Sequence, residues 1–154
     1  MKTNAVRILE SNGIHFSTIE YEFSEDELDA VSVAAKINAE LETVFKTLVT
    51  RNEKNEIFVF VIPGNYELNL KKAAIASKSK KIEMIKVKEL QPLTGYIRGG
   101  CSPIGMKKNY PTFIDESAQL HENIFISAGK RGMQIKLNPQ MLCMLINGQY
   151  ADLI

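Results

Sequence analysis

The sequence predicts a single α+β domain in which helices pack on a curved mixed β-sheet. The chain has 154 residues, of which 45% are hydrophobic and 24% are charged. This length and composition suit one compact domain with a buried core and exclude a disordered or fibrous chain. Apolar strand patterns recur along the whole chain, whereas amphipathic helical spacing is confined to short segments. The sequence contains no repeats, linkers or low-complexity tracts, so these elements together indicate one α+β domain.

The N-terminal segment predicts a short amphipathic helix followed by a strand. Thr3 can cap the helix, and Gly13 stands where a left-handed residue would end it. Residues 14–23 follow as a half-buried strand, because apolar residues alternate there with glutamates. The alternation breaks at residues 17–18, which we interpret as a bulge.

An acidic loop then leads into a second helix and a central hairpin. The helix covers residues 31–37, with Asp29 or Ser32 as its cap. Residues 44–51 and 56–62 are apolar on both faces and are joined by a polar turn. This pattern predicts two antiparallel strands that are both buried.

The remainder of the chain predicts two more helices and then a strand-rich region. One helix covers residues 68–76 with lysines on its outer side, and another begins at residue 86 and stops before Pro92. The following pattern predicts four short strands and a final helix, at residues 96–98, 112–115, 123–127, 133–137 and 139–146.

Charge is unevenly distributed along the sequence. Residues 1–45 hold three Lys+Arg against nine Asp+Glu, a net charge of −6, and residues 46–154 hold 16 against nine, a net charge of +7. The basic residues form short clusters at 71–72, 78–81, 107–108 and 130–131. Such clusters are either solvated faces or a docking surface for a polyanion such as nucleic acid, and charge alone does not separate these alternatives.

Several classes of protein are disfavoured by what the sequence lacks. No apolar run approaches the roughly 18 residues of a membrane span, and residues 1–11 lack the apolar stretch of a signal peptide, so we expect a cytoplasmic protein without membrane contact. Cys101 and Cys143 are too few for a disulfide framework or a zinc cage. We therefore expect no structural metal.

Lys46 is the first candidate functional residue. It places an ammonium group inside the otherwise apolar strand at residues 44–49, where an unpaired charge is unfavourable. Either Lys46 points into a cleft and binds an anionic or polar substrate group, or it lies near the strand end and reaches water.

The glycine-rich segment at residues 95–106 is the second candidate. Consecutive glycines let backbone N–H groups approach a ligand closely and hold a phosphate or a developing oxyanion, although a tight structural turn would use the same residues. Cys101 lies in this segment, but neither histidine stands in a recognisable hydrolase setting, so we interpret its thiol as structural. Residues 127–132 form a further glycine-rich turn with a hydroxyl and two cations.

Five blocks of the sequence together resemble a known family. They stand at residues 45–48, 61–64, 93–108, 112–116 and 127–132. In this order they closely resemble the YbaK/EbsC family, whose best-known members are bacterial Cys-tRNA(Pro) deacylases related to the editing domain inserted in prolyl-tRNA synthetases. The resemblance implies one domain over residues 1–154, a barrel-like mixed sheet flanked by helices, and a cleft where the Lys46 strand meets the glycine loop.

The resemblance also implies a reaction and a set of partners. The expected reaction is release of cysteine from mischarged Cys-tRNA(Pro), with the thiol of the bound cysteine attacking its own ester, and with no cofactor or metal. The expected partners are mischarged tRNA(Pro) and, transiently, prolyl-tRNA synthetase. Because cysteine is nearly the size of proline, a synthetase pocket that sorts by size discriminates the two poorly, so a separate editing site that removes the cysteine is physically sensible.

The resemblance assigns roles to individual residues. Lys46 would anchor the terminal adenosine or the ester, and Gly99 and Gly100 would offer backbone N–H donors to the oxyanion. Three further residues would line the substrate pocket, namely Tyr21, Thr47 and Ser127.

One position departs from the family pattern, and other functions stay open. Relatives commonly have an acidic residue shortly after the turn at 127–132, where this chain has Gln134; Asp115 or Glu116 are candidates to compensate. Related subfamilies act on alanine or serine esters, so a deacylase of that specificity is an alternative. A noncatalytic RNA-binding module would need only the basic surface, and a cysteine hydrolase would depend on Cys101.

Overall fold

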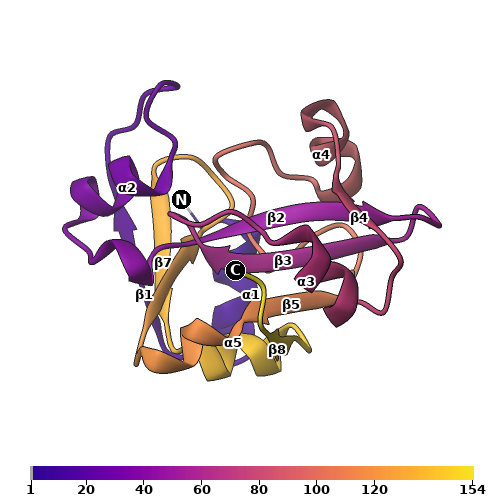
Figure 1. Cartoon of the computed structure of the whole chain (residues 1–154). Coiled ribbons are helices and arrows are strands. Elements are labelled where there is room, and N and C mark those ends of the chain that lie inside the picture. The colour runs from indigo at the N-terminus through magenta and orange to yellow at the C-terminus, as the bar shows by residue number, and fades with distance from the viewer. Residues whose placement is uncertain (1) are drawn as a thin grey trace.

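The computed structural model describes residues 2–154 and confirms the α+β class (Figure 1). The α-helices in this range are α1 (Asn4–Ser11), α2 (Ala30–Ile37), α3 (Leu70–Ala76), α4 (Val87–Thr94) and α5 (Pro139–Leu145). Short 3₁₀ helices occupy Leu41–Thr43 and Glu116–Leu120. The strands are β1 (Phe16–Glu20), β2 (Phe45–Asn52), β3 (Ile57–Pro63), β4 (Ile82–Met84), β5 (Thr112–Asp115), β6 (Ile124–Ser127), β7 (Met133–Leu137) and β8 (Gln149–Ala151).

The strands form two sheets. One has the order β1-β7-β6 and is antiparallel, and the other has the order β4-β2-β3-β5-β8, in which the β3–β5 and β5–β8 pairs are parallel. A parallel bridge between Val44 and Phe125 links the sheets. The mixed sheet is therefore confirmed, but the strands described in residues 2–154 close no barrel, so the barrel-like arrangement is not confirmed.

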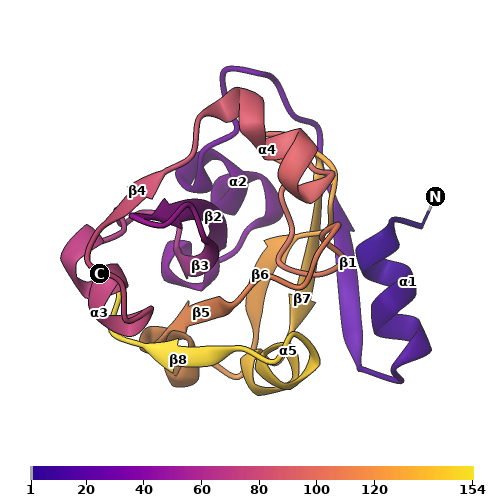
Figure 2. The same cartoon turned by 90° about the vertical axis from the view of Figure 1, so that its right-hand side faces the viewer.

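Apolar side chains from both sheets and the helices form the core. β3 is buried on both faces: Val61 packs in the cluster that includes α1, whereas Phe60 and Ile62 pack with alanines of α3. Figure 2 shows α1 lying beside β1, at the edge of the three-stranded sheet. A third cluster joins α2 to the sheets through Val33, among others, so α2 is fixed where β2 begins.

Most of the predicted elements are confirmed, including the capped first helix and the central hairpin. The Thr3 side chain accepts a hydrogen bond from the N–H of Val6, and β2 pairs with β3 from Phe45–Pro63 to Arg51–Ile57. Of the two candidate caps for α2, Asp29 is the one used, accepting from the Ser32 N–H at 2.8 Å.

Three predictions about local structure are wrong. The β1–β7 register runs without interruption through residues 17–18, so there is no bulge. α4 continues through Pro92 and ends only at Gly95, which adopts φ +86° and donates its N–H to the carbonyl of Gln91. Residues 96–98 form a loop rather than a strand, because Gly95 and Gly99 both adopt positive φ.

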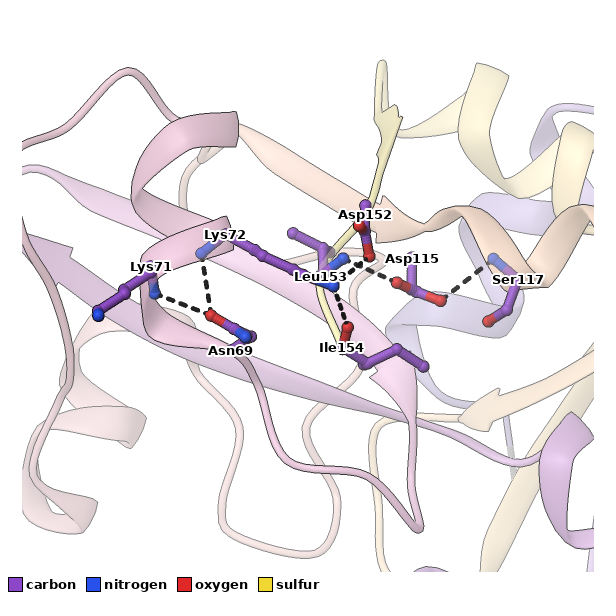
Figure 3. A network of polar contacts seen from close by, with 8 residues as sticks. All are labelled: Asn69, Lys71, Lys72, Asp115, Ser117, Asp152, Leu153 and Ile154. Carbon is purple, nitrogen blue, oxygen red and sulfur yellow. Dashed lines mark hydrogen bonds and ion pairs between the residues drawn. The ribbon is translucent and has the colours of Figure 1, made fainter.

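Residues 152–154, which follow β8, are held by a polar network (Figure 3). The buried carboxylate of Asp115 accepts hydrogen bonds from the N–H groups of Leu153, at 2.9 Å, and Ser117, at 3.1 Å. Lys72 of α3 contacts Asp152 at 3.0 Å. Asp115 therefore has a structural role here.

None of the helices in residues 2–154 has the length and apolar character that crossing a membrane requires.

Candidate functional site

A small cavity lies where α2, the start of β2, the glycine-rich loop and the β6–β7 turn meet. Its volume is about 100 Å³, roughly that of three water molecules, so it suits a small acyl group. The cavity is lined by Leu28, Ala30, Val33, Val44, Phe45, Lys46, Thr47, Gly99, Cys101, Ser127 and Gln134. It thus brings together four of the six residues that the sequence analysis selected, from segments up to about 80 positions apart: Lys46, Thr47, Gly99 and Ser127.

The wall formed by α2 depends on a close approach of its first residue to the hairpin. A Cβ atom on Gly64 would lie 2.2 Å from the Cβ atom of Ala30, so only glycine fits at this position. The Gly64 N–H donates to the carbonyl of Val44 at 2.8 Å. Gly64 thereby fixes both the start of β2 and the helix that faces it.

Lys46 is a half-buried cation without a protein partner. Among residues 2–154, its ammonium group makes no ion pair or hydrogen bond. Desolvation by burial lowers the pKa of Lys46, and the charge of Glu67 acts weakly in the opposite direction. A cation that has lost water and has no ion-pair partner can be stabilised by a bound anionic or polar group.

The two central glycines of the loop have different roles. Gly99, at φ +84°, lines the cavity, and a Cβ atom there would lie 3.0 Å from the side chain of Leu28. Gly100 is not among the lining residues, and its N–H donates to the carbonyl of Ile97 at 3.0 Å. A Cβ atom on Gly100 would lie 3.0 Å from the backbone of Lys130, so the structure assigns Gly100 to packing against the β6–β7 turn.

Tyr96 holds the same loop against the β6–β7 turn from the other side. Its hydroxyl donates to the carbonyl of Ile104, and its ring lies 2.9 Å from where a Cβ atom on Gly129 would stand. Burial raises the pKa of Tyr96 to about 12, so the hydroxyl keeps the proton that it donates. The loop is therefore anchored at several points rather than free to move.

Cys101 lines the cavity but is a poor nucleophile. Burial raises the pKa of its thiol to about 12, against a smaller opposing effect of the Thr94 hydrogen bond, so the thiol stays protonated at neutral pH. Within residues 2–154 no histidine lines the cavity, so no imidazole there can deprotonate Cys101. These observations support the interpretation of Cys101 as a structural residue.

Tyr21 reaches the site only through a neighbour. It is not among the lining residues, and its hydroxyl accepts a long hydrogen bond of 3.5 Å from Nε2 of Gln134, which does line the cavity. In the sequence, Gln134 stands out only as a departure from the family pattern, and its place at the cavity was not predicted. A polar residue between Met133 and Ile135 in a buried strand was the available signal.

Asp115 and Glu116 do not compensate for Gln134. They line a separate hollow at the C-terminal end of the fold, beside Asp152, and the Asp115 carboxylate is occupied there by backbone N–H groups. No carboxylate lines the cavity in the described part of the chain.

Two glutamates of the acidic N-terminal segment lie near the basic cluster at residues 130–131. Lys130 lies 3.6 Å from Glu20, and Arg131 lies 3.9 Å from Glu25. Arg131 also donates to the carbonyl of Arg98 at 2.8 Å. The cluster at residues 130–131 therefore helps to fasten the loops around the site and is partly paired with protein carboxylates.

The fold is that of an aminoacyl-tRNA editing domain. The chain matches the aminoacyl-tRNA editing domain over residues 24–143, and it belongs to this family. The membership confirms the resemblance that the sequence blocks indicated.

Individual relatives are similar over most of the chain. A protein of Enterococcus faecalis provisionally named Cys-tRNA(Pro)/Cys-tRNA(Cys) deacylase EbsC is 53% identical over 152 residues, which cover 99% of this chain and 93% of that protein. A proline–tRNA ligase of Brachyspira hyodysenteriae is 28% identical over 99 residues, 64% of this chain and 17% of the ligase. A crystal structure assigned to a trans-editing enzyme for prolyl tRNA synthetase superposes with a TM-score of 0.84 at 25% identity, covering 99% of this chain and 98% of the other.

Proposed function

We propose that this protein is a trans-editing deacylase that releases cysteine from mischarged Cys-tRNA(Pro), and that residues 1–154 work as one editing domain. The observation that carries the proposal is the 53% identity, over 99% of the chain, to a relative named for this activity. The small cavity beside an unpartnered lysine supports it, because a short acyl group fits there whereas the tRNA body stays outside.

In the proposed reaction the substrate supplies the nucleophile. The sulfur of the esterified cysteine attacks its own carbonyl carbon, the bond from that carbon to the ribose oxygen breaks, and the thiol proton ends on the released ribose hydroxyl. The acyl group leaves as a cyclic thiolactone. The protein folds the acyl group into this geometry and stabilises the oxyanion.

Each residue at the cavity has a proposed part in this reaction. Lys46 holds the terminal adenosine or the ester, and the Gly99 N–H, for which the protein offers no acceptor within residues 2–154, donates to the oxyanion. Thr47 and Ser127 contact the acyl group, and Tyr21 supports it through Gln134. Gly100 acts by holding the loop in place.

The name of the Enterococcus relative covers cysteine on two different tRNAs, which supports recognition of the amino acid rather than of the tRNA body. We propose that a transient complex with prolyl-tRNA synthetase directs this domain to tRNA(Pro) in the cytoplasm. Addition of the synthetase to the reaction is expected to raise the rate on Cys-tRNA(Pro) and to leave the rate on Cys-tRNA(Cys) unchanged.

The proposal is tested by following ester loss from tRNA(Pro) charged with cysteine, alanine, serine or proline. We expect rapid loss of cysteine only, and no acceleration for S-methylcysteine, whose sulfur carries no proton and cannot close the ring. Faster release of alanine or serine would assign the domain to another small amino acid. Binding of charged tRNA without ester loss would make it a noncatalytic RNA-binding module.

A further inference from the structure

Gln134 is a buried polar residue at the centre of the three-stranded sheet. It lies on β7, where it pairs with Ile19 of β1 on one side and with Ser127 of β6 on the other. Only 6% of its surface is exposed, yet it lines the cavity together with Ser127 and Lys46. Its position on a central strand fixes the amide more firmly than a loop would.

The amide of Gln134 is poorly satisfied by the protein. Its Oε1 atom is buried and has no hydrogen-bond partner among residues 2–154, and its Nε2 atom has only the 3.5 Å contact to the Tyr21 hydroxyl. Buried polar atoms in folded proteins are nearly always paired, so an orphaned acceptor at the wall of a cavity needs an explanation. A donor brought by a ligand provides one.

The charge of the cavity restricts what that donor can be. Lys46 is the only charged residue among those that line it in the described chain, and no carboxylate is present to balance a second cation. An ammonium group in this space would lose water and meet a like charge. A neutral donor, such as an uncharged amine or a hydroxyl group, meets neither penalty.

We propose that Gln134 is a specificity-determining residue that recognises the α-amino group of the aminoacyl ester in its uncharged form, with Oε1 accepting one N–H. The inference rests on the proposed deacylase function and adds which form of the substrate the site accepts. An α-amino group has an ordinary pKa of about 8, so its uncharged form is readily reached near neutral pH.

The other groups around Gln134 leave this role to its amide oxygen. Tyr21, the residue after β1, already contacts Nε2 of the same amide, and the Ser127 hydroxyl of β6 accepts a hydrogen bond from the Gly129 N–H at 3.2 Å. Lys46 of β2 is a donor when charged, and the thiol of Cys101 is a weak acceptor. Among the described residues that line the cavity, Gln134 is the one whose side chain has a fully buried oxygen without a partner.

The test compares three acyl groups on tRNA(Pro) that all keep the thiol: cysteinyl, 2-hydroxy-3-mercaptopropionyl and 3-mercaptopropionyl. The first carries an amine at the α-carbon, the second a neutral hydroxyl, and the third no donor. For the wild-type protein, we expect kcat/KM for the cysteinyl and hydroxy substrates to agree within about threefold. We expect kcat/KM for the 3-mercaptopropionyl substrate to be at least about tenfold lower, because it leaves the buried acceptor of Gln134 without a donor.

Two variants of Gln134 make the test specific. Gln134→Met removes the acceptor at similar length, and we expect it to bring all three substrates within about threefold of one another. Gln134→Glu adds a carboxylate, so the amine, which can now enter as an ammonium, should be preferred over the hydroxyl. Thermal unfolding checks that each variant is folded, and either variant alone suffices for the comparison.

The outcomes separate this inference from the proposed function. If wild-type protein does not release cysteine at all, the proposed function fails. If it releases cysteine but the donor-free substrate loses the same factor in wild type and in both variants, the role of Gln134 is refuted. If wild type handles the hydroxy substrate as poorly as the donor-free one, recognition of an uncharged donor is refuted.

Discussion

Replacing Lys46 with methionine separates the cost of this residue to the fold from its benefit to the reaction. The ammonium group of Lys46 is half-buried and has no hydrogen-bond or ion-pair partner within residues 2–154, and the charge of Glu67 offsets its desolvation only in part. Lys46→Met keeps the length of the side chain and removes the charge. We therefore expect the variant to be at least as stable as the wild type in thermal unfolding.

The expected effect on activity has the opposite sign. A hydrogen bond from a charged group is worth about 1.5–3 kcal/mol, and about 1.4 kcal/mol corresponds to a factor of ten in rate. Lys46→Met should thus lower kcat/KM for Cys-tRNA(Pro) by about 10- to 150-fold. The matched control is Lys54→Met, at an exposed lysine in the turn between β2 and β3, for which kcat/KM should stay unchanged.

The pH dependence of stability gives an independent check. Because burial lowers the pKa of Lys46 in the folded state, the unfolded chain binds the proton more tightly than the folded protein does. Charged Lys46 therefore lowers the free energy of unfolding, and this effect is fully present below the folded-state pKa. It is relieved as the pH rises from that value towards the ordinary lysine pKa. Lys46→Met should lack this component of the stability curve. A variant with normal stability and kcat/KM within about threefold of wild type would refute the role of Lys46.

Three further substitutions and one control variant test the rest of the site. Cys101→Ser should retain kcat/KM within about threefold, because the pKa of about 12 keeps this thiol protonated; loss of turnover in a folded variant would instead indicate a cysteine nucleophile. Gly100→Ala should cost about 1–3 kcal/mol of stability by overpacking and should also lower activity. Its control is Gly13→Ala, where a Cβ atom meets nothing within 4 Å. Because Gly13 has a positive φ, this control should lower Tm and leave activity unchanged. Asp29→Ala should cost about 1 kcal/mol through the lost cap of α2. The Ser32 hydrogen bonds hold the pKa of Asp29 below its usual range, so this difference should vanish as the pH falls through the lowered pKa, and a constant difference would contradict the capping role.

The sequence was informative wherever local chemistry decides structure. The β2–β3 hairpin follows from its apolar pattern, and α2 follows from the cap at Asp29. The strands β4 and β8 were missed because each has three residues and depends on distant partners, β2 and β5, for its hydrogen bonds. Local pattern carries little information about such short edges.

The site was predictable only in part for a related reason. Lys46 was conspicuous as a charge inside an apolar strand, and Gly99 as part of a dense glycine segment. The packing role of Gly100 depends on the backbone of a turn about 30 residues away, which no local pattern reveals. Gln134 became visible as a candidate only when its amide was found to be buried and unpartnered at the cavity.

The central claim is that the cavity between Lys46 and Gly99 holds the cysteinyl ester. The most direct test is a crystal structure with an uncleavable analogue, in which an amide joins cysteine to the 3′ position of adenosine. We expect the acyl group in the cavity, Lys46 Nζ within about 3 Å of a ribose or acyl oxygen, and the thiol sulfur within about 3.5 Å of the carbonyl carbon. An analogue bound elsewhere, with Nζ of Lys46 in solvent, would contradict the claim.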